Sequence, residues 1–378
     1  MDLIYLDHAA TTPLDKEVMN EALPYFLENY GNADSPHALG RKAMGAVDEA
    51  RDTVAALLSA RKNEVYFTSG GTEADNWAVL GGAWAKRREG RTKILLSAVE
   101  HHAVLSCGER LAKEGFTVEY IPVNAGGRVE LSALENAIDD DTALVGLMSV
   151  NNETGVLQPV REASEIAHAH GALFFTDAVQ SAPHIPIRVD ELGADMLSFS
   201  AHKFYGPKGV GVLYIKNGVK VDKLVAGGEQ ERGMRGGTVN VPLVVALAKA
   251  YEKCRRDMQA TNEKLRALST LFLREISVLD GVHRNGENAL PCLLNLRFEG
   301  VTNTSFLYNM DLQGVCLAAG SACASASVKP SHVLTAMGLT DEQAKECVRI
   351  SLGKDNTEAE IHRAAQLTVE TVNRLRNM

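Results

Sequence analysis

Asp177 and Lys203 are the two residues of this chain whose types and spacing best suit covalent chemistry. Asp177 closes the apolar run ALFFT, and Lys203 follows downstream in the run SAHKFYGPKG. Pyridoxal phosphate (PLP) needs both types of residue, because a buried carboxylate keeps its pyridine nitrogen protonated and an amine forms a Schiff base with its aldehyde. The same residues also fit a strand cap and a solvated loop lysine, so other motifs must decide between the two interpretations.

A phosphate-binding turn is predicted at residues 68–76, where TSGGTEADN follows a strand and opens a helix. The free N–H groups at a helix start attract an anion, Gly71 permits close backbone approach, and Thr72 adds a hydroxyl. Ser200 and His202 beside the lysine would position the amine and the phosphate. A helix N-cap with a tight turn explains residues 68–76 equally well.

Three further polar side chains are candidates for contacts with a ring or a substrate. His101, in EHHAV, follows the strand predicted at 93–96 and would lie over a flat cofactor ring, whereas we interpret His102 as a surface residue. Asn152, in VNNETG, would reach the ring oxygen or a substrate carboxylate, or would simply form a turn. Arg349, in the apolar run CVRISLG, would either pair with an internal acid or bind a ligand carboxylate.

Cys323 is the candidate nucleophile. It lies in AAGSACASAS, a run of small residues with no large apolar side chain, which favours an exposed and reactive thiol. Its thiolate would need a nearby base or cation, and His101 is a candidate. We expect the other cysteines, at 107, 254, 292, 316 and 347, to be small buried thiols. No Cys-x-x-Cys pair or zinc-like Cys/His spacing occurs, so no structural metal is expected.

The composition is that of an ordinary globular protein with a large core. The chain has 378 residues, 45% of them hydrophobic, and a net charge of −9. The acidic balance and the absence of long basic runs disfavour binding to nucleic acid or to an anionic membrane. No apolar run reaches the roughly 18 residues that span a bilayer, and the acidic start MDLIYLD does not resemble a signal peptide. We therefore expect a cytoplasmic protein.

Helical and strand-like patterns alternate through the first two thirds of the chain, which predicts an α/β fold with a mostly parallel sheet covered by helices. Ligands of such sheets bind at the carboxyl ends of the strands. We predict a large domain over 15–255 and a smaller α+β domain formed by 1–14 and 256–378. The expected helices are 41–59, 73–86, 104–114, 161–170, 242–277 and 357–376, and the expected strands are 65–68, 93–96, 117–121, 144–148, 172–176 and 293–298.

Together these motifs resemble the cysteine desulfurases, the NifS/IscS-like enzymes of the class-V aminotransferase family. The likeness begins at YLDHAATTP, residues 5–13, and continues through every motif above to Arg349. It implies the PLP-dependent transferase fold of type I, with a seven-stranded, mostly parallel sheet between helices and a smaller α+β domain. The long loop around Cys323 is similar to that of the group I enzymes rather than the short-loop type.

The resemblance also implies roles for individual residues. Lys203 would bond to PLP, Asp177 would pair with the pyridine nitrogen, and Cys323 would take sulfur from L-cysteine as a persulfide. The remaining positions would surround the cofactor and substrate: His101 stacked on the ring, Gln180 beside its hydroxyl, Gly71, Thr72, Ser200 and His202 at the phosphate, Thr238 reaching in from a second subunit of a homodimer, and Asn152 and Arg349 on the substrate carboxylate.

The implied product is L-alanine, and the implied partner is a sulfur acceptor such as an iron–sulfur scaffold or a thiolation relay. Cys323 is also the expected ligand of an iron–sulfur cluster in transfer. Two departures from relatives stand out: KDNT at 354–357 replaces a common arginine and threonine, and the chain ends at Met378 without the segment with which IscS-type members hold a scaffold. The alternatives are a selenocysteine lyase, a class-V aminotransferase, or a non-catalytic sulfur-relay protein.

Overall fold

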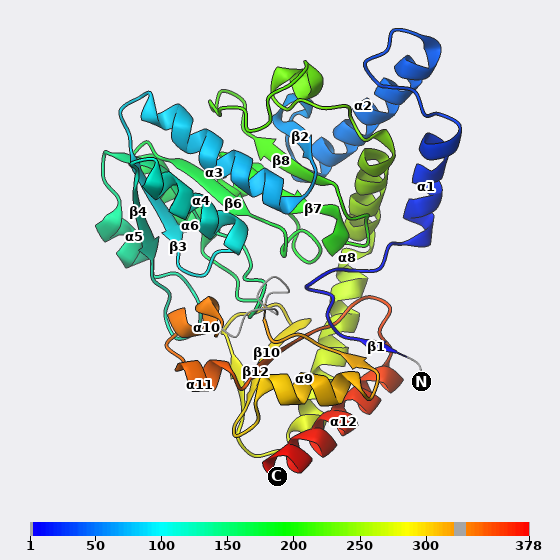
Figure 1. Ribbon diagram of the computed structural model, residues 1–378, viewed down its shortest axis with the longest axis vertical. Helices are drawn as coiled ribbons and strands as arrows, with labels where there is room; N and C mark the ends of the chain where they lie inside the picture. The colour runs from blue at the N-terminus through cyan, green and yellow to red at the C-terminus, as the bar shows by residue number, and fades with distance from the viewer. Residues whose placement is uncertain (1–2, 321–329, 378) are drawn as a thin grey trace.

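The computed structural model describes residues 3–320 and 330–377. Its largest element is a seven-stranded sheet with the strand order β2-β8-β7-β6-β5-β3-β4 (Figure 1). Strands β3 to β7 run parallel to one another, and β8 is antiparallel to both β2 and β7. The strands are β2 (Val65–Thr68), β3 (Lys93–Ser97), β4 (Thr117–Ile121), β5 (Thr142–Gly146), β6 (Leu173–Asp177), β7 (Met196–Ser200) and β8 (Gly211–Ile215).

Helices cover both faces of this sheet, as expected for buried parallel strands. One face packs against α3 and α4, through buried residues such as Trp77 and Leu111, and the other against α2, α6 and α8. The helices around the large sheet are α1 (Lys16–Leu27), α2 (Ala38–Leu58), α3 (Gly71–Arg87), α4 (His102–Lys113), α5 (Leu131–Ala137), α6 (Val160–Ala169), α7 (Val189–Leu192) and α8 (Val241–Ile276), with short 3₁₀ turns η1 (Lys62–Glu64), η2 (Ala201–Lys203) and η3 (Gln230–Gly233).

A second, antiparallel sheet has the order β12-β10-β9 and its own apolar core. The C-terminal half of α8 contributes Leu265 and Phe272 to that core, so this helix links the two sheets. The N-terminal strand β1 (Ile4–Tyr5) pairs in parallel with β11 (Val315–Cys316). The other elements are β9 (Val282–Asn285), β10 (Leu293–Phe298), β12 (Cys347–Ser351), α9 (Asn303–Asp311), α10 (His332–Ala336), α11 (Asp341–Ala344) and α12 (Glu358–Arg376).

The predicted elements are present, with one displaced strand. The strand expected at 144–148 is β5, Thr142–Gly146. Beyond its end the N–H of Leu147 still donates to the Phe175 carbonyl of β6, while the N–H of Met148 donates to the Glu100 side chain at 2.6 Å. The predicted division near residue 255 falls inside the continuous helix α8 and stays a prediction. Among the described residues, none of the helices has the length and apolar character needed to cross a membrane.

Candidate active site

A cavity of about 200 Å³ lies at the carboxyl ends of the parallel strands. Parallel strands bring their ends to one edge of the sheet, which gathers side chains that are far apart in sequence. Ten of the predicted site residues line this cavity: Gly71, Thr72, His101, Asn152, Asp177, Gln180, Ser200, His202, Lys203 and Arg349. Two do not: Thr238 is exposed on this chain, and Cys323 lies outside the described residues.

Asp177 is the last residue of β6 and is 5% exposed. One carboxylate oxygen accepts the N–H of Val179 at 2.8 Å. Burial raises the pKa of Asp177 to about 6, while the Val179 N–H and the positive charge of Lys203 oppose that rise. A buried carboxylate of this kind gains most from a cationic N–H partner, which is what a protonated pyridine ring supplies.

Lys203 ends the η2 turn directly after β7. Its Nζ atom lies 2.5 Å from the main-chain oxygen of Ala9 and 2.9 Å from that of Ala10. The side chain is therefore directed by the N-terminal segment as well as by its own turn. Gln180 contacts the same segment, because its Nε2 donates to the Ala9 oxygen at 2.9 Å.

His101 precedes α4 and faces the cavity. Its Nδ1 accepts the N–H of Ala103 at 3.1 Å, so the neutral ring carries its proton on Nε2. Burial, with smaller contributions from the charges of Lys203, His102 and His332, lowers the pKa of His101 to about 4. At neutral pH the ring is therefore uncharged and able to stack on another ring. His102 is exposed, as predicted.

The N-terminus of α3 forms one end of the cavity. Gly70, at φ 155°, precedes the helix, and a Cβ atom at Gly71 would lie 3.0 Å from Val179 Cγ2. Only a residue without a side chain fits here without displacing Val179. Ser200 closes the facing strand β7, and the His202 ring lies 3.2 Å (Nδ1) from Thr11 Oγ1. Helix N–H groups and hydroxyls at one end of the cavity suit a phosphate group.

Arg349, in the middle of β12, is only 1% exposed. Its Nη2 donates to Asp7 Oδ1 at 2.8 Å and its Nη1 to the Asn152 main-chain oxygen at 2.9 Å. Its Nε has no hydrogen-bond partner within the described part of the chain. The arginine therefore pairs with an internal acid and also retains a buried donor for a ligand, so the two sequence interpretations are compatible.

Sequence reasoning missed two buried acids, Asp75, which lines the cavity, and Glu100, which precedes the lining residue His101. Asp75, on α3, accepts a short hydrogen bond from the Ser198 hydroxyl, and burial raises its pKa well above the usual range. Glu100 is fully buried, and burial raises its pKa to about 8. Both lie within the motifs TSGGTEADN and EHHAV, but each has a polar neighbour in the sequence, Asn76 and His101, so residue type alone gave no sign of their burial.

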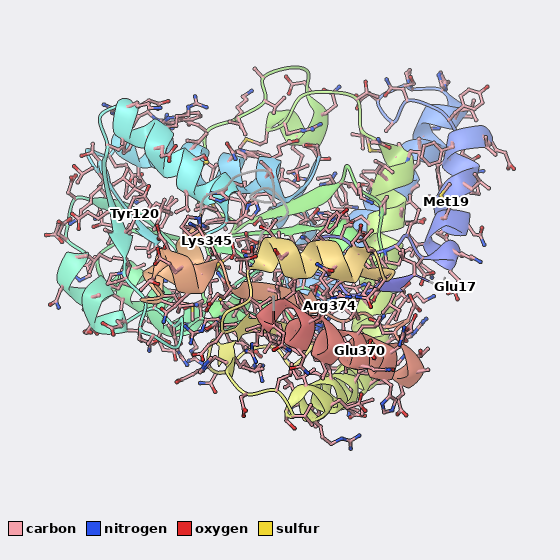
Figure 2. All side chains as sticks on the ribbon, turned by 60° about the horizontal axis from the view of Figure 1, so that its bottom comes forward. Glu17, Met19, Tyr120, Lys345, Glu370 and Arg374 are labelled. Carbon is pink, nitrogen blue, oxygen red and sulfur yellow. The ribbon has the colours of Figure 1, made fainter. Side chains whose placement is uncertain are left out.

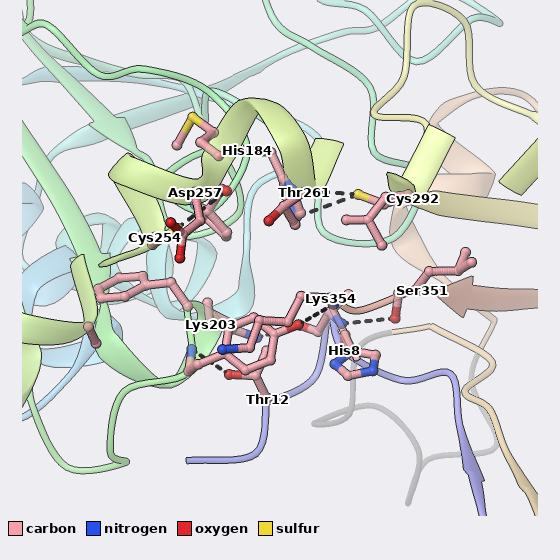
Figure 3. Close-up of a pocket in the computed structure, with 18 of the residues that line it drawn as sticks. His8, Thr12, His184, Lys203, Cys254, Asp257, Thr261, Cys292, Ser351 and Lys354 are labelled. Carbon is pink, nitrogen blue, oxygen red and sulfur yellow. Dashed lines mark hydrogen bonds between the residues drawn. The ribbon is translucent and has the colours of Figure 1, made fainter. Parts of the chain in front are cut away.

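A second cavity, of about 60 Å³, shares Ala9, Gln180 and Lys203 with the first (Figure 3). There Cys292 Sγ lies 3.5 Å from His184 Nε2, and Cys254 lines the same cavity. Burial raises the pKa of both thiols to about 12, so neither is a thiolate at neutral pH. These cysteines are packing residues, as expected from the sequence.

The residues present fit PLP. The buried carboxylate of Asp177 can pair with the pyridinium nitrogen, and Lys203 lines the same cavity. The neutral imidazole of His101 can stack on the ring, and the N-terminus of α3 can bind the phosphate. This donor set and the mostly parallel sheet define a PLP-dependent enzyme of fold type I.

Comparison with known proteins agrees with that class. The family model for aminotransferase class-V matches residues 4–364. Cysteine desulfurase IscS of Clostridium botulinum strain Hall is 44% identical over 380 residues, covering 99% of this chain and 96% of the relative. Among solved structures, a NifS-like protein has a TM-score of 0.92 at 35% identity, covering 98% of this chain and 99% of that one.

A further solved structure, described as SspA in complex with cysteine, has a TM-score of 0.83 at 35% identity and covers 94% of this chain and all of its own. The chain belongs to the class-V aminotransferase family, as a member of its cysteine desulfurases. The family likeness predicted from the motifs is confirmed, and so is the fold.

Proposed function

We propose that this protein converts L-cysteine to L-alanine and transfers the sulfur to Cys323, giving a persulfide. The reaction balances without another reactant: the thiol of Cys323 and L-cysteine become the persulfide and L-alanine. The observation that carries the proposal is the cavity itself, which is lined by the buried carboxylate of Asp177, the amine of Lys203 and Arg349, whose Nε has no partner among residues 3–320 and 330–377.

PLP, when bound, supplies an electron sink for the charge that develops at the substrate Cα. Asp177 would hold the proton on the ring nitrogen, and Lys203 would move the proton that leaves Cα. His101, whose Nδ1 accepts the Ala103 N–H, would stack on the ring. Gly71, Thr72, Ser200 and His202 would bind the phosphate, and Gln180 would lie beside the ring hydroxyl.

Arg349 and Asn152 bind the substrate carboxylate. The Nε of Arg349 is a buried donor that a carboxylate oxygen would satisfy, and the main-chain oxygen of Asn152 holds the guanidinium from the other side. A charge-assisted hydrogen bond to a carboxylate is about twice as strong as a neutral one. This contact favours amino acids over simple amines.

Cys323 takes the sulfur. Its thiolate attacks the substrate Sγ, the new S–S bond forms as the Cβ–S bond breaks, and the electron pair remains on the carbon fragment that becomes alanine. Burial raises the pKa of the described Cys107, Cys254, Cys292 and Cys347 thiols to about 12, so these four are poor nucleophiles. Cys323 is the remaining thiol that sequence reasoning marked as reactive.

The working form is a homodimer in which Thr238 of one subunit reaches the phosphate of the other. Thr238 is exposed on its own chain and does not line its own cavity. A row of exposed apolar side chains along α1 supports a protein contact there: Met19, labelled in Figure 2, is 37% exposed, Phe26 is 47% and Leu27 is 66%. Sedimentation that gave a monomer with bound PLP would contradict the dimer.

The persulfide then passes to a sulfur acceptor, such as an iron–sulfur scaffold or a thiolation relay, in the cytoplasm. The five described cysteines are all free thiols, which suits a reducing compartment.

Product analysis tests the proposed function. Purified protein loaded with PLP is incubated with L-cysteine and dithiothreitol, and alanine and sulfide are quantified together. We expect equal amounts of the two products, loss of both in Cys323→Ala, and normal turnover in the matched control Cys316→Ala, whose thiol is also free. Parallel assays with L-selenocysteine measure the preference between the two substrates.

Mass spectrometry after L-cysteine treatment without reductant should show one added sulfur on the peptide that contains Cys323. Alanine formation that survives in Cys323→Ala would contradict the role of this cysteine. The absence of both products from the PLP-loaded protein would contradict the desulfurase assignment itself and favour amino-group transfer.

A further inference from the structure

Residues 7–12, which we call the strap, connect the side chains of the candidate active site. Asp7 accepts from Arg349, and the carbonyls of Ala9 and Ala10 accept from Lys203. The strap runs between β1, which pairs with β11, and α1, which packs on α8. One short segment thus contacts the predicted carboxylate-binding arginine through a side chain and the predicted cofactor-binding lysine through its backbone.

The strap is held at both ends by hydrogen bonds. The Tyr5 hydroxyl lies 3.0 Å from the main-chain oxygen of Asp7 and 2.9 Å from that of Thr11, so it ties the two ends together. The N–H of Ala9 donates to Ser351 Oγ at 2.8 Å, which joins the strap to the strand that carries Arg349. These ties fix the place of Asp7 relative to β12.

The strap also contacts the turn that carries Lys203. Thr12 Oγ1 donates to the main-chain oxygen of His202 at 2.8 Å, and the N–H of Tyr205 donates to the same hydroxyl at 2.7 Å. Figure 3 shows Thr12, Lys203 and Ser351 along this path. A shift of Asp7 would therefore move the backbone that contacts Lys203 and its turn.

The ion pair between Asp7 and Arg349 fixes the orientation of the guanidinium. Arg349 is 1% exposed, and a cation that deeply buried needs a counter-charge. Nη2 is held by Asp7 and Nη1 by the Asn152 carbonyl, so the plane of the group is set by two contacts on different elements. The orientation leaves Nε without a protein partner in the described part of the chain, and Arg349 lines the cavity.

We propose that Asp7 is a positioning residue for carboxylate recognition. Asp7 holds the Arg349 guanidinium in the orientation that offers its remaining donors to the carboxylate of the amino acid, and the strap links that contact to Lys203. This inference rests on the proposed function, because it takes Arg349 as the carboxylate ligand. Asp7 does not line the cavity, so its effect is on selectivity for the carboxylate rather than on bond breaking.

Two ligands that differ only by the carboxylate test this proposal. L-alanine and ethylamine are mixed separately with the PLP-loaded enzyme, and the second-order rate of the absorbance change of the cofactor is measured for each. The ratio of the two rates reports carboxylate recognition, because general damage to the cavity slows both ligands alike. The variants are Asp7→Ala, which removes the contact to Arg349, and Asp7→Asn, whose amide oxygen can still accept from Nη2.

We expect Asp7→Ala to lower the alanine-to-ethylamine ratio by about tenfold or more, the size of a lost charge-assisted hydrogen bond. Asp7→Asn should keep the ratio within about threefold of the native value, since the accepting oxygen remains. Asp15→Ala is the matched control: Asp15 pairs with Lys253 and Lys354 and does not line the cofactor cavity, so it should leave the ratio unchanged. Thermal unfolding of each PLP-loaded variant identifies any that fail to fold.

An unchanged ratio in Asp7→Ala would overturn the positioning role, and so would an equal slowing of both ligands in that variant. If the alanine-to-ethylamine ratio fell as far in Asp7→Asn as in Asp7→Ala, the positioning role would also be contradicted. The charge of Asp7, rather than the orientation of Arg349, would then determine carboxylate recognition. If the native enzyme does not prefer L-alanine to ethylamine, the carboxylate role of Arg349 in the proposed function fails, and this outcome is separate from the result for Asp7.

Discussion

The Ser198 hydroxyl donates a hydrogen bond to the buried carboxyl group of Asp75. Ser198 is also the register partner of Asp177 on the adjacent strand, so two acids from different elements line the same part of the cavity. Burial raises the pKa of both, and the charge of Asp177 raises that of Asp75 further. Two carboxyl groups in one buried place do not both ionise easily. We infer that Asp177 carries the charge and Asp75 keeps its proton.

Replacement of Asp177 by Asn should weaken cofactor binding. The amide cannot hold a proton on the pyridine nitrogen, and the cationic ring would lose its counter-charge in a buried site. We expect PLP to dissociate from Asp177→Asn at least about tenfold faster than from the native protein, equivalent to roughly 1.4 kcal/mol or more. The measurement is the decay of cofactor absorbance after dilution into an excess of a PLP-trapping reagent. Unaltered retention of PLP would refute the pairing.

Asp75→Asn should behave differently from Asp177→Asn, although both changes remove one carboxyl group. An amide resembles a protonated acid in shape and charge, and its oxygen can still accept from the Ser198 hydroxyl. We expect PLP retention within about threefold of native, because no buried charge is removed. Fast PLP loss in Asp75→Asn would mean that Asp75 is ionised in the holoenzyme.

Glu100 offers a test through pH and stability. One oxygen accepts the Met148 N–H at 2.6 Å, and Oε2 has no partner among the described residues. Burial raises the pKa of Glu100 to about 8. In the unfolded chain this acid loses its proton near pH 4.5, so between that pH and about 8 the folded state binds more protons, and stability falls as pH rises.

Glu100→Gln cannot titrate, so the variant does not show this fall in folding stability. Its stability relative to the native protein should therefore increase as pH rises from 5 to 8. The difference in melting temperature between the variant and the native protein should be small at pH 5, largest at pH 8 and constant above it. The exposed Glu135 provides the control Glu135→Gln, which should show no such trend. A difference that does not change with pH would show that Glu100 titrates at its ordinary value.

Residues at strand ends were predictable from the sequence because the rules of parallel sheets place them. Asp177, Ser200 and His101 each follow an apolar run, and such runs end at one edge of the sheet. The contact of Glu100 with the Met148 N–H, beyond the end of β5, was not predictable, because the acceptor is a side chain from a different strand connection.

The strap could not have been predicted as part of the site from its own residues. Its contacts to Lys203 are made by backbone carbonyls, which every residue type has, and Asp7 contacts Arg349 from the opposite end of the chain.

The structure explains the lysine at 354, one of the positions at which this sequence departs from its relatives. Its ammonium pairs with Asp15 and lies 4.2 Å from the centroid of the Tyr205 ring, so it ties the last third of the chain to the first turn of α1.

The buried ion pair of Arg51 and Glu231 should control the stability of the segment that leads to Thr238. The two side chains make two contacts of 2.7 Å, and Glu231 also accepts the N–H of Phe67. Glu231→Ala leaves a buried arginine without a counter-charge, and we expect a loss of about 3 kcal/mol in the free energy of unfolding, measured with urea. The double variant Arg51→Met, Glu231→Leu should recover much of this loss, whereas equal instability of the two would contradict the charge argument.

The phosphate end of the cavity can be tested through one steric contact. A Cβ atom at Gly71 would lie 3.0 Å from Val179 Cγ2, and Val179 supplies the N–H that holds Asp177. Gly71→Ala should therefore displace Val179 and lower PLP affinity several-fold, although alanine is the better helix former. Val179→Ala removes the obstructing methyl groups, so affinity in the double variant should exceed that of Gly71→Ala alone. If the loss of PLP affinity in the double variant equals the sum of the losses in the two single variants, the two residues act independently.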